Sequence, residues 1–114
     1  IKKAFSLFLK KNPSQLITGN LSKKNPYFNQ VESRNGYVKL VKKNKNPVIR
    51  RQDAPKIYDM NASIYIFKRS TLMRKNITFP KKTIIYQMPE KRSIDIDSHL
   101  DFKIVEMIMK CKIN

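Results

Sequence analysis

The segment Ala62-Ser-Ile-Tyr-Ile-Phe67 has the strongest β-strand pattern in this chain. Most of its residues are β-branched or aromatic, and such side chains pack well on a pleated, half-buried surface. A second segment of this kind, Thr83-Ile-Ile-Tyr-Gln-Met88, ends at Pro89, which cannot continue a central strand. The short apolar segment 15–18 is a third candidate for a buried strand. The sequence therefore predicts a sheet that includes these three segments.

Helical patterns alternate with these strands. Before Pro13, apolar residues recur at helical spacing: Ile1, Ala4, Phe5, Phe8 and Leu9. Residues 69–74 suffice for one or two helical turns. Ser98 can cap a final helix, where Asp101 would interact favourably with the helix dipole. The apolar stripe of that helix ends at Cys111, which we expect in the core. Alternating strands and helices predict an α/β fold.

Asn35-Gly36 is the strongest hairpin signal in the sequence. It separates two candidate strands, residues 27–34 and 37–42. A two-residue loop sets Val31 opposite Leu40 and Glu32 opposite Lys39, an apolar pair and an oppositely charged pair. We therefore expect a β-hairpin with this register as an excursion from the α/β fold.

The chain has 114 residues, enough for one domain with a modest core. No apolar run approaches the length of a membrane span, and lysines near the start interrupt any signal-peptide core. Its single cysteine excludes an internal disulfide framework and fits a reducing compartment. These features predict a cytoplasmic protein without membrane association.

The net charge of +17, from 25 basic and 8 acidic residues, suggests nucleic acid as a partner. Lysine outnumbers arginine 19 to 6, however, and arginine is the residue suited to bidentate phosphate and base recognition. The lysines are also scattered along the chain. A small basic module that binds nucleic acid or an acidic partner remains the alternative interpretation.

Two carboxylates stand two positions apart in Ser93-Ile-Asp95-Ile-Asp97. In an extended backbone, Asp95 and Asp97 leave on one face and the two isoleucines on the other. Paired oxygen donors suit Mg²⁺ when substrate phosphates complete its coordination. The simpler interpretation is a solvated strand end before a helix. With one histidine and two glycines, the sequence has neither a His-based triad nor a glycine-rich phosphate loop.

Two further groups have both a functional and a structural interpretation. Arg50-Arg51-Gln52 offers guanidinium forks and an amide for an anionic ligand, or forms a solvated loop paired with Asp53. Tyr65 and Phe79 could line a ligand pocket or simply cover the core.

Five segments occur in the order and approximate spacing of a known family: Asn25-Pro-Tyr-Phe-Asn, Arg50-Arg-Gln-Asp-Ala-Pro, Asn61-Ala-Ser-Ile-Tyr-Ile, Met88-Pro-Glu-Lys-Arg-Ser-Ile-Asp-Ile-Asp-Ser and Leu100-Asp-Phe. Over nearly its whole length the chain resembles the C-terminal half of CMP-sialic acid synthetases, the acylneuraminate cytidylyltransferases. These enzymes transfer CMP from CTP to the anomeric hydroxyl of a nonulosonic acid and release pyrophosphate, with Mg²⁺.

The resemblance implies part of a three-layer, mostly parallel, Rossmann-like nucleotidyltransferase sheet, with residues 1–114 forming one part of a domain. It also implies a homodimer through the hairpin excursion, at about residues 25–56. Asp95 and Asp97 would be catalytic Mg²⁺ ligands. Arg51 would reach the sugar site of the neighbouring subunit. The residues implied to bind substrate are Arg51, Gln52, Asn61, Tyr65 and Phe79.

The family's N-terminal loop, which holds the CTP phosphates, has no counterpart here. We therefore expect a fragment of a longer enzyme or a truncated product, inactive by itself, and an inactive paralogue that only dimerises is the other possibility. The Asn61-Ala-Ser-Ile-Tyr segment looks closer to sialate and legionaminate synthetases than to pseudaminate ones. Such sugars imply a role in lipopolysaccharide or capsule biosynthesis.

Overall fold

A computed structural model describes residues 1–43, 50–74 and 79–111 of the chain. The chain divides into two compact units, one of residues 1–20 and 60–114 and the other of residues 21–59. Among the described helices, none has the length and hydropathy that crossing a membrane requires.

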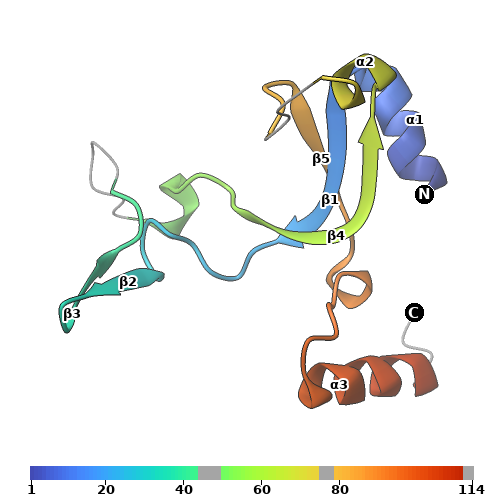
Figure 1. Ribbon diagram of the computed structural model, residues 1–114. Helices are drawn as coiled ribbons and strands as arrows, with labels where there is room; N and C mark the ends of the chain where they lie inside the picture. Colours follow the sequence, from blue (N-terminus) through green and yellow to red (C-terminus); the bar gives the residue numbers. More distant parts are fainter. Residues whose placement is uncertain (44–49, 75–78, 112–114) are drawn as a thin grey trace. The chain divides into compact units, whose positions relative to one another are not determined.

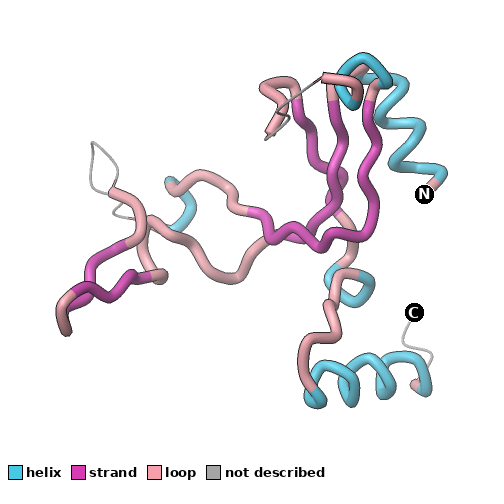
Figure 2. Tube along the Cα trace, viewed as in Figure 1, coloured by secondary structure: helices cyan, strands magenta, loops and turns pink. Residues whose placement is uncertain are grey.

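The first unit is built on a three-stranded sheet in the order β4-β1-β5 (Figures 1 and 2). Its strands are β1 (Gln15–Leu21), β4 (Tyr58–Phe67) and β5 (Thr83–Gln87). The three predicted strand segments therefore form one sheet, although β1 and β4 extend beyond their predicted bounds. β1 and β5 are parallel, with Leu16 opposite Ile84 and Thr18 opposite Tyr86.

The opposite edge of the sheet is antiparallel. Lys68 donates its N–H to the Ser14 carbonyl at one end, and Ser22 donates to the Ile57 carbonyl at the other. Residue numbers therefore fall along β4 as they rise along β1, and Figure 1 shows the opposed arrows. The described sheet is mixed, whereas a mostly parallel sheet was expected from the resemblance. The periodicity of a strand sets its faces but does not encode its direction relative to a neighbour.

 β4 carries an irregularity near Ala62, whose φ of 47° lies in the left-handed region. Two residues on, the Ile64 N–H donates to the Thr18 hydroxyl at 3.0 Å. A positive φ in a strand beside an amide bonded to a side chain is typical of a bulge, which bends the strand and redirects its side chains.

Helix α1 (Lys2–Lys11) covers the small apolar core of this unit. Ala4 and Phe8 from α1 are buried together with Leu16 from β1. Partly buried side chains surround this cluster: Leu7, Ile66, Ile84 and Tyr86. The helix ends as predicted before Pro13, with Asn12 in the left-handed conformation and its N–H bonded to the Phe8 carbonyl. Phe5 and Leu9, which belong to the same predicted stripe, are exposed.

Two further helices belong to this unit. α2 (Arg69–Leu72) follows β4 at the predicted place, and α3 (His99–Lys110) ends the described chain. No residue of α3 is buried, and Cys111 is exposed at its end, so the expectation of a core cysteine was wrong. Within the described residues, no other element covers the apolar side of α3 closely enough to bury it.

The second unit contains the hairpin of β2 (Val31–Arg34) and β3 (Tyr37–Leu40), and the 3₁₀ turn η1 (Arg51–Asp53). Val31 lies opposite Leu40, and Glu32 lies opposite Lys39, which is the register expected from the sequence. Asn35 and Gly36 have φ values of 52° and 80°, and positive values at both central residues are characteristic of a type I′ turn. The Glu32 and Lys39 side chains form an ion pair at 2.9 Å.

Asn25 fixes the chain on either side of this hairpin. Its side-chain amide donates to the Pro55 carbonyl at 3.1 Å, and its side-chain oxygen accepts from the Tyr27 N–H at 3.0 Å. Its own N–H donates to the side-chain oxygen of Asn29. The buried Asn25 therefore joins the segment that enters the hairpin to the segment that leaves it.

The small core makes Leu16 its most sensitive position. Leu16→Ala removes a fully buried side chain, and we expect a loss of about 2 to 5 kcal/mol in the free energy of unfolding. Leu9→Ala is the matched control, because Leu9 is 63% exposed and should change stability by less than about 0.5 kcal/mol. Urea denaturation followed by circular dichroism measures both. Equal losses would contradict this description of the core.

Candidate functional site

The candidate site lies on the segment that follows β5. The Met88 N–H donates to the Gly19 carbonyl at 2.8 Å, so the parallel ladder of β1 and β5 continues to this point. The chain then forms the 3₁₀ turn η2 (Glu90–Arg92) and runs without regular secondary structure to Ser98. In open α/β sheets, ligands bind outside the carboxyl ends of parallel strands, which is where this segment begins.

A buried amide connects this segment to the sheet. Asn61 on β4 is only 6% exposed. Its side-chain nitrogen donates to the Ser93 hydroxyl at 2.9 Å and to the Met88 sulfur at 3.3 Å. Its side-chain oxygen accepts from the Thr18 hydroxyl at 2.7 Å and from the Ser63 N–H at 3.3 Å. We call Thr18, Asn61, Met88 and Ser93 the Asn61 cluster.

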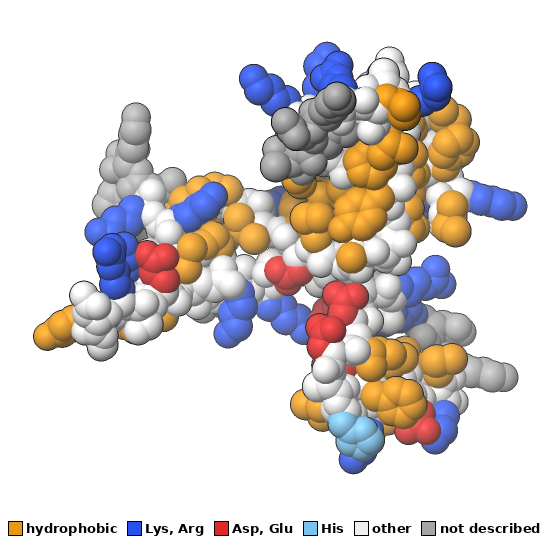
Figure 3. Space-filling model, in the orientation of Figure 1, with side chains coloured by type: hydrophobic (Ala, Val, Ile, Leu, Met, Phe, Trp, Pro, Cys, Tyr) orange, Lys and Arg blue, Asp and Glu red, His pale blue; other side chains and the backbone are white. Residues whose placement is uncertain are grey.

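Asp95 and Asp97 are exposed, two and four residues beyond this anchor. Within the described part of the chain, neither carboxylate has a hydrogen bond or an ion pair. Ile94 is half-buried while Ile96 is 54% exposed, so only one of the two isoleucines packs to any extent. Figure 3 shows acidic side chains gathered over the segment between β5 and α3.

The donor set suits a hard cation that retains other ligands. Among the described residues, no group of three or more His, Cys, Asp or Glu side chains is placed to hold a metal ion. Two carboxylate donors match the way Mg²⁺ is usually bound, through one or two carboxylates with water and substrate phosphates. Asp95 and Asp97 therefore fit a substrate-dependent Mg²⁺ site and not an enclosed structural one.

The helix that follows is capped as predicted. The Ser98 hydroxyl accepts the Asp101 N–H at 3.2 Å, and the Asp101 carboxylate accepts the Ser98 N–H at 2.9 Å. This reciprocal capping box satisfies two amides that α3 cannot pair internally. The Ser98 hydroxyl also donates to the Asp101 carboxylate, and this bond lowers the pKa of Asp101 below its usual 3.8.

The aromatic candidates lie at separate places in the first unit. Tyr65 is on β4, 44% exposed, with its ring stacked on that of Phe67 at 6.4 Å between centroids. Phe79 is 59% exposed and precedes Pro80, whose carbonyl accepts the Thr83 hydroxyl at 2.6 Å. Both rings are therefore accessible to a ligand, and neither belongs to the core cluster.

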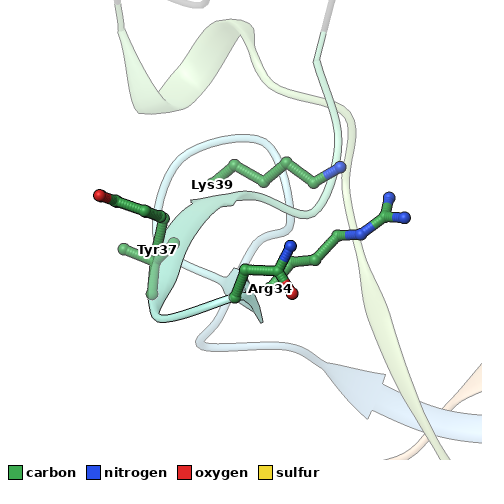
Figure 4. Close-up of a pocket in the computed structure, with 5 residues that line it drawn as sticks. Arg34, Tyr37 and Lys39 are labelled. Atoms are coloured by element: carbon green, nitrogen blue, oxygen red, sulfur yellow. The ribbon is translucent and has the colours of Figure 1, made fainter.

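The remaining candidates belong to the second unit. Gln52 is exposed in η1, and the Arg51 side chain lies outside the described residues. A hollow of about 300 Å³ lies on the hairpin of this unit, lined by Arg34, Asn35, Tyr37, Val38 and Lys39. Figure 4 shows the Arg34 and Lys39 side chains extending to the same side of the hairpin. All five lining residues are exposed, so the hollow is a surface feature.

The sequence predictions did not include Thr18, Met88 or Ser93 as neighbours of Asn61. The sequence could have indicated only that Thr18 has a partner, because a hydroxyl within the buried segment Gln15–Gly19 needs a hydrogen bond. Nothing in the sequence identifies that partner, which is 43 residues away.

Comparison with known proteins gives close sequence relatives. The chain is 46% identical over 112 residues to post-translational flagellin modification protein B of Campylobacter coli, covering 98% of this chain and 47% of that protein. It is 50% identical over 97 residues to CMP-N,N'-diacetyllegionaminic acid synthase of Campylobacter jejuni, covering 85% of this chain and 40% of the synthase. An N-acylneuraminate cytidylyltransferase of Streptococcus agalactiae is 29% identical over 103 residues, or 90% of this chain and 24% of that enzyme.

The chain belongs to the CMP-sialic acid synthetase family. It spans less than half the length of these relatives. No protein-family model matches it. The family resemblance stated from the sequence is therefore confirmed by relatives that cover most of the chain.

The capping box predicts a measurable pH response. Because the folded-state pKa of Asp101 is lowered, its stabilisation of α3 is present above the unfolded pKa and is lost as pH falls through the folded pKa. An NMR titration of the Asp101 carboxylate should give a pKa below 3.8. Ser98→Ala should raise that pKa, because it removes the largest cause of the shift, while Ser70→Ala should not. An unchanged pKa in Ser98→Ala would contradict the capping geometry.

Proposed function

We propose that this chain forms the metal- and sugar-binding part of a CMP-nonulosonic acid synthetase. In the reaction, the anomeric hydroxyl oxygen of the sugar acid attacks the α-phosphorus of CTP, and the bond to the pyrophosphate leaving group breaks. The observation that carries the proposal is the pair of accessible carboxylates, Asp95 and Asp97, near the carboxyl ends of β1 and β5. The relatives named above support the reaction class.

Asp95 and Asp97 would hold Mg²⁺ on the phosphate side of the site. When bound, the ion would neutralise charge on the phosphates of CTP and on the departing pyrophosphate. The carboxylates themselves would orient the ion, and their lack of described partners leaves their oxygens available for that role. Water and phosphate oxygens would supply the other ligands.

The sugar acid would bind among residues that include Tyr65 and Phe79. Their exposed rings offer apolar surface to the sugar ring. Arg51, reaching from a second subunit, and Gln52 would supply donors to the sugar carboxylate. The greater identity to a legionaminic acid synthase than to neuraminate cytidylyltransferases favours a legionaminic-type substrate. The groups that hold the cytosine and the CTP phosphates would come from outside these 114 residues.

The hairpin would form the subunit interface. Val31, Tyr37 and Val38 are exposed on it, and an isolated two-stranded ribbon is at best marginally stable in water. Pairing with the same ribbon of a second subunit about a two-fold axis would cover these side chains. Arg51 would then act in the sugar site of the partner.

A chimera tests this function without depending on where the chain begins. This chain replaces the matching segment of the C. jejuni synthase, and CMP-sugar formation is measured with legionaminic-type and sialic acids. We expect activity from the chimera, and Asp97→Asn in it should lower kcat about 100-fold or more because a charged metal ligand is lost.

Asp59→Asn is the matched control, since Asp59 is an exposed carboxylate on β4 outside the proposed site. It should leave the rate unchanged. If Asp97→Asn retained full activity at limiting Mg²⁺, the metal role of Asp97 would be wrong. A well-folded chimera without synthesis of any CMP-sugar would count against the whole assignment.

Subunit complementation tests the proposed role of Arg51. Chimeras with Arg51→Ala and with Asp97→Ala are each expected to be inactive, and mixing them with subunit exchange should restore activity. Random exchange about a two-fold axis would give about a quarter of the unmutated activity, because half the dimers have one intact site. No recovery despite demonstrated exchange would place Arg51 in the site of its own subunit or outside catalysis.

A further inference from the structure

Asn61 has no hydrogen-bonding capacity left for a ligand. An amide side chain can donate two hydrogen bonds from nitrogen and accept two at oxygen. The nitrogen donates to the Ser93 hydroxyl and the Met88 sulfur, and the oxygen accepts from Thr18 and Ser63. The Ser63 N–H can only donate, which fixes the oxygen on that side and the nitrogen toward Ser93.

These bonds link three separate parts of the first unit. Thr18 is on β1, Asn61 on β4, and Met88 and Ser93 lie beyond β5. The Thr18 hydroxyl is itself committed, since it also accepts the Ile64 N–H at 3.0 Å. A buried amide with four protein partners has few alternative orientations, because each rotation would leave a buried polar group unpaired.

The Ser93 end of this arrangement leads directly to the two carboxylates. Residues 94–97 have no regular secondary structure, so no ladder of backbone hydrogen bonds fixes them. The Ser93 bond to Asn61 ties one end of the segment to the sheet, and at the other end the Ser98 capping box begins α3. The only half-buried side chain between these points is that of Ile94.

We propose that Asn61 is a positioning residue that fixes the Ser93–Asp97 segment, and with it the Asp95 and Asp97 carboxylates, through its bond to the Ser93 hydroxyl. The metal role of the carboxylates rests on the function proposed above, whereas the fixing of the segment does not. Groups that orient metal ligands commonly change metal affinity by about 10- to 100-fold when they are removed.

The test uses the 114-residue chain without metal or substrate. The backbone order parameters of residues 94–97, measured by NMR relaxation, should fall below about 0.6, the range of flexible backbone, in Ser93→Ala and in Asn61→Ala. Ser93→Thr keeps a hydroxyl and should retain the wild-type order parameters. Ser70→Ala makes the same chemical change at an exposed position on α2 and should have no effect.

The double variant separates positioning from general destabilisation. If Asn61 acts through Ser93, adding Ser93→Ala to Asn61→Ala should not lower the order parameters of residues 94–97 further. Residues of β1 and β5 should keep their wild-type order parameters in Ser93→Ala, so that variant remains informative if Asn61→Ala fails to fold. Unchanged order parameters at residues 94–97 in Ser93→Ala would overturn the proposal.

A second readout connects the segment to the metal. Mn²⁺ titration of the chimera with CTP present, followed by electron paramagnetic resonance, should show about 10- to 100-fold weaker binding in Ser93→Ala, with affinity restored in Ser93→Thr. If the wild-type chimera with CTP binds no Mn²⁺, the proposed metal site fails, and the order parameters alone then support or overturn the role of Asn61. Equal Mn²⁺ affinity in wild type and Ser93→Ala would overturn its effect on the carboxylates.

Discussion

The buried side-chain amide of Asn61 is the constraint that connects the sheet to the candidate site. A buried polar group must be paired, and the amide meets this requirement with partners from β1, β4 and the segment after β5. The same bonds that satisfy its nitrogen and oxygen therefore set where Ser93 lies. Because Asp95 and Asp97 follow within four residues, the position of the carboxylates depends on a side chain that does not touch them.

The apolar core provides less constraint than this polar cluster. The buried hydrophobic core of the described chain has four members: Ala4, Phe8, Leu16 and Ile17. Many large apolar side chains are exposed, including Leu100, Met107 and Met109 on α3. The stabilising free energy from hydrophobic burial is roughly proportional to the apolar area removed from water. A core of this size therefore supplies limited stability. Directional hydrogen bonds consequently carry much of the specificity of the arrangement.

The two ends of the carboxylate segment are held by different kinds of interaction. Ser93 is held by a contact 32 residues distant in sequence, inside the protein. Ser98 is held by a local capping box with Asp101, exposed to solvent. A segment tied to the sheet at Ser93 and continuing into α3 at Ser98, without its own backbone ladder, can keep its carboxylates accessible. This combination suits a metal that must also bind a substrate phosphate.

The sequence by itself determined the local elements. The β-branched segments at 62–67 and 83–88 became strands, Asn35-Gly36 set the hairpin register, and Ser98 with Asp101 began α3. Each depends on residues at most a few positions apart, or on one short turn. The pair Asp95 and Asp97 was also recognisable from sequence, as was the family.

Only the tertiary structure decided the strand order β4-β1-β5, the antiparallel direction of β4 and the partners of Asn61. Residue periodicity specifies which face of a strand is buried, but it contains no information about the neighbour across the ladder. Thr18 and Ser93 are 43 and 32 residues from Asn61. Both residues bond to Asn61 because folding brings three distant segments to one end of the sheet, where each buried polar group must find a partner.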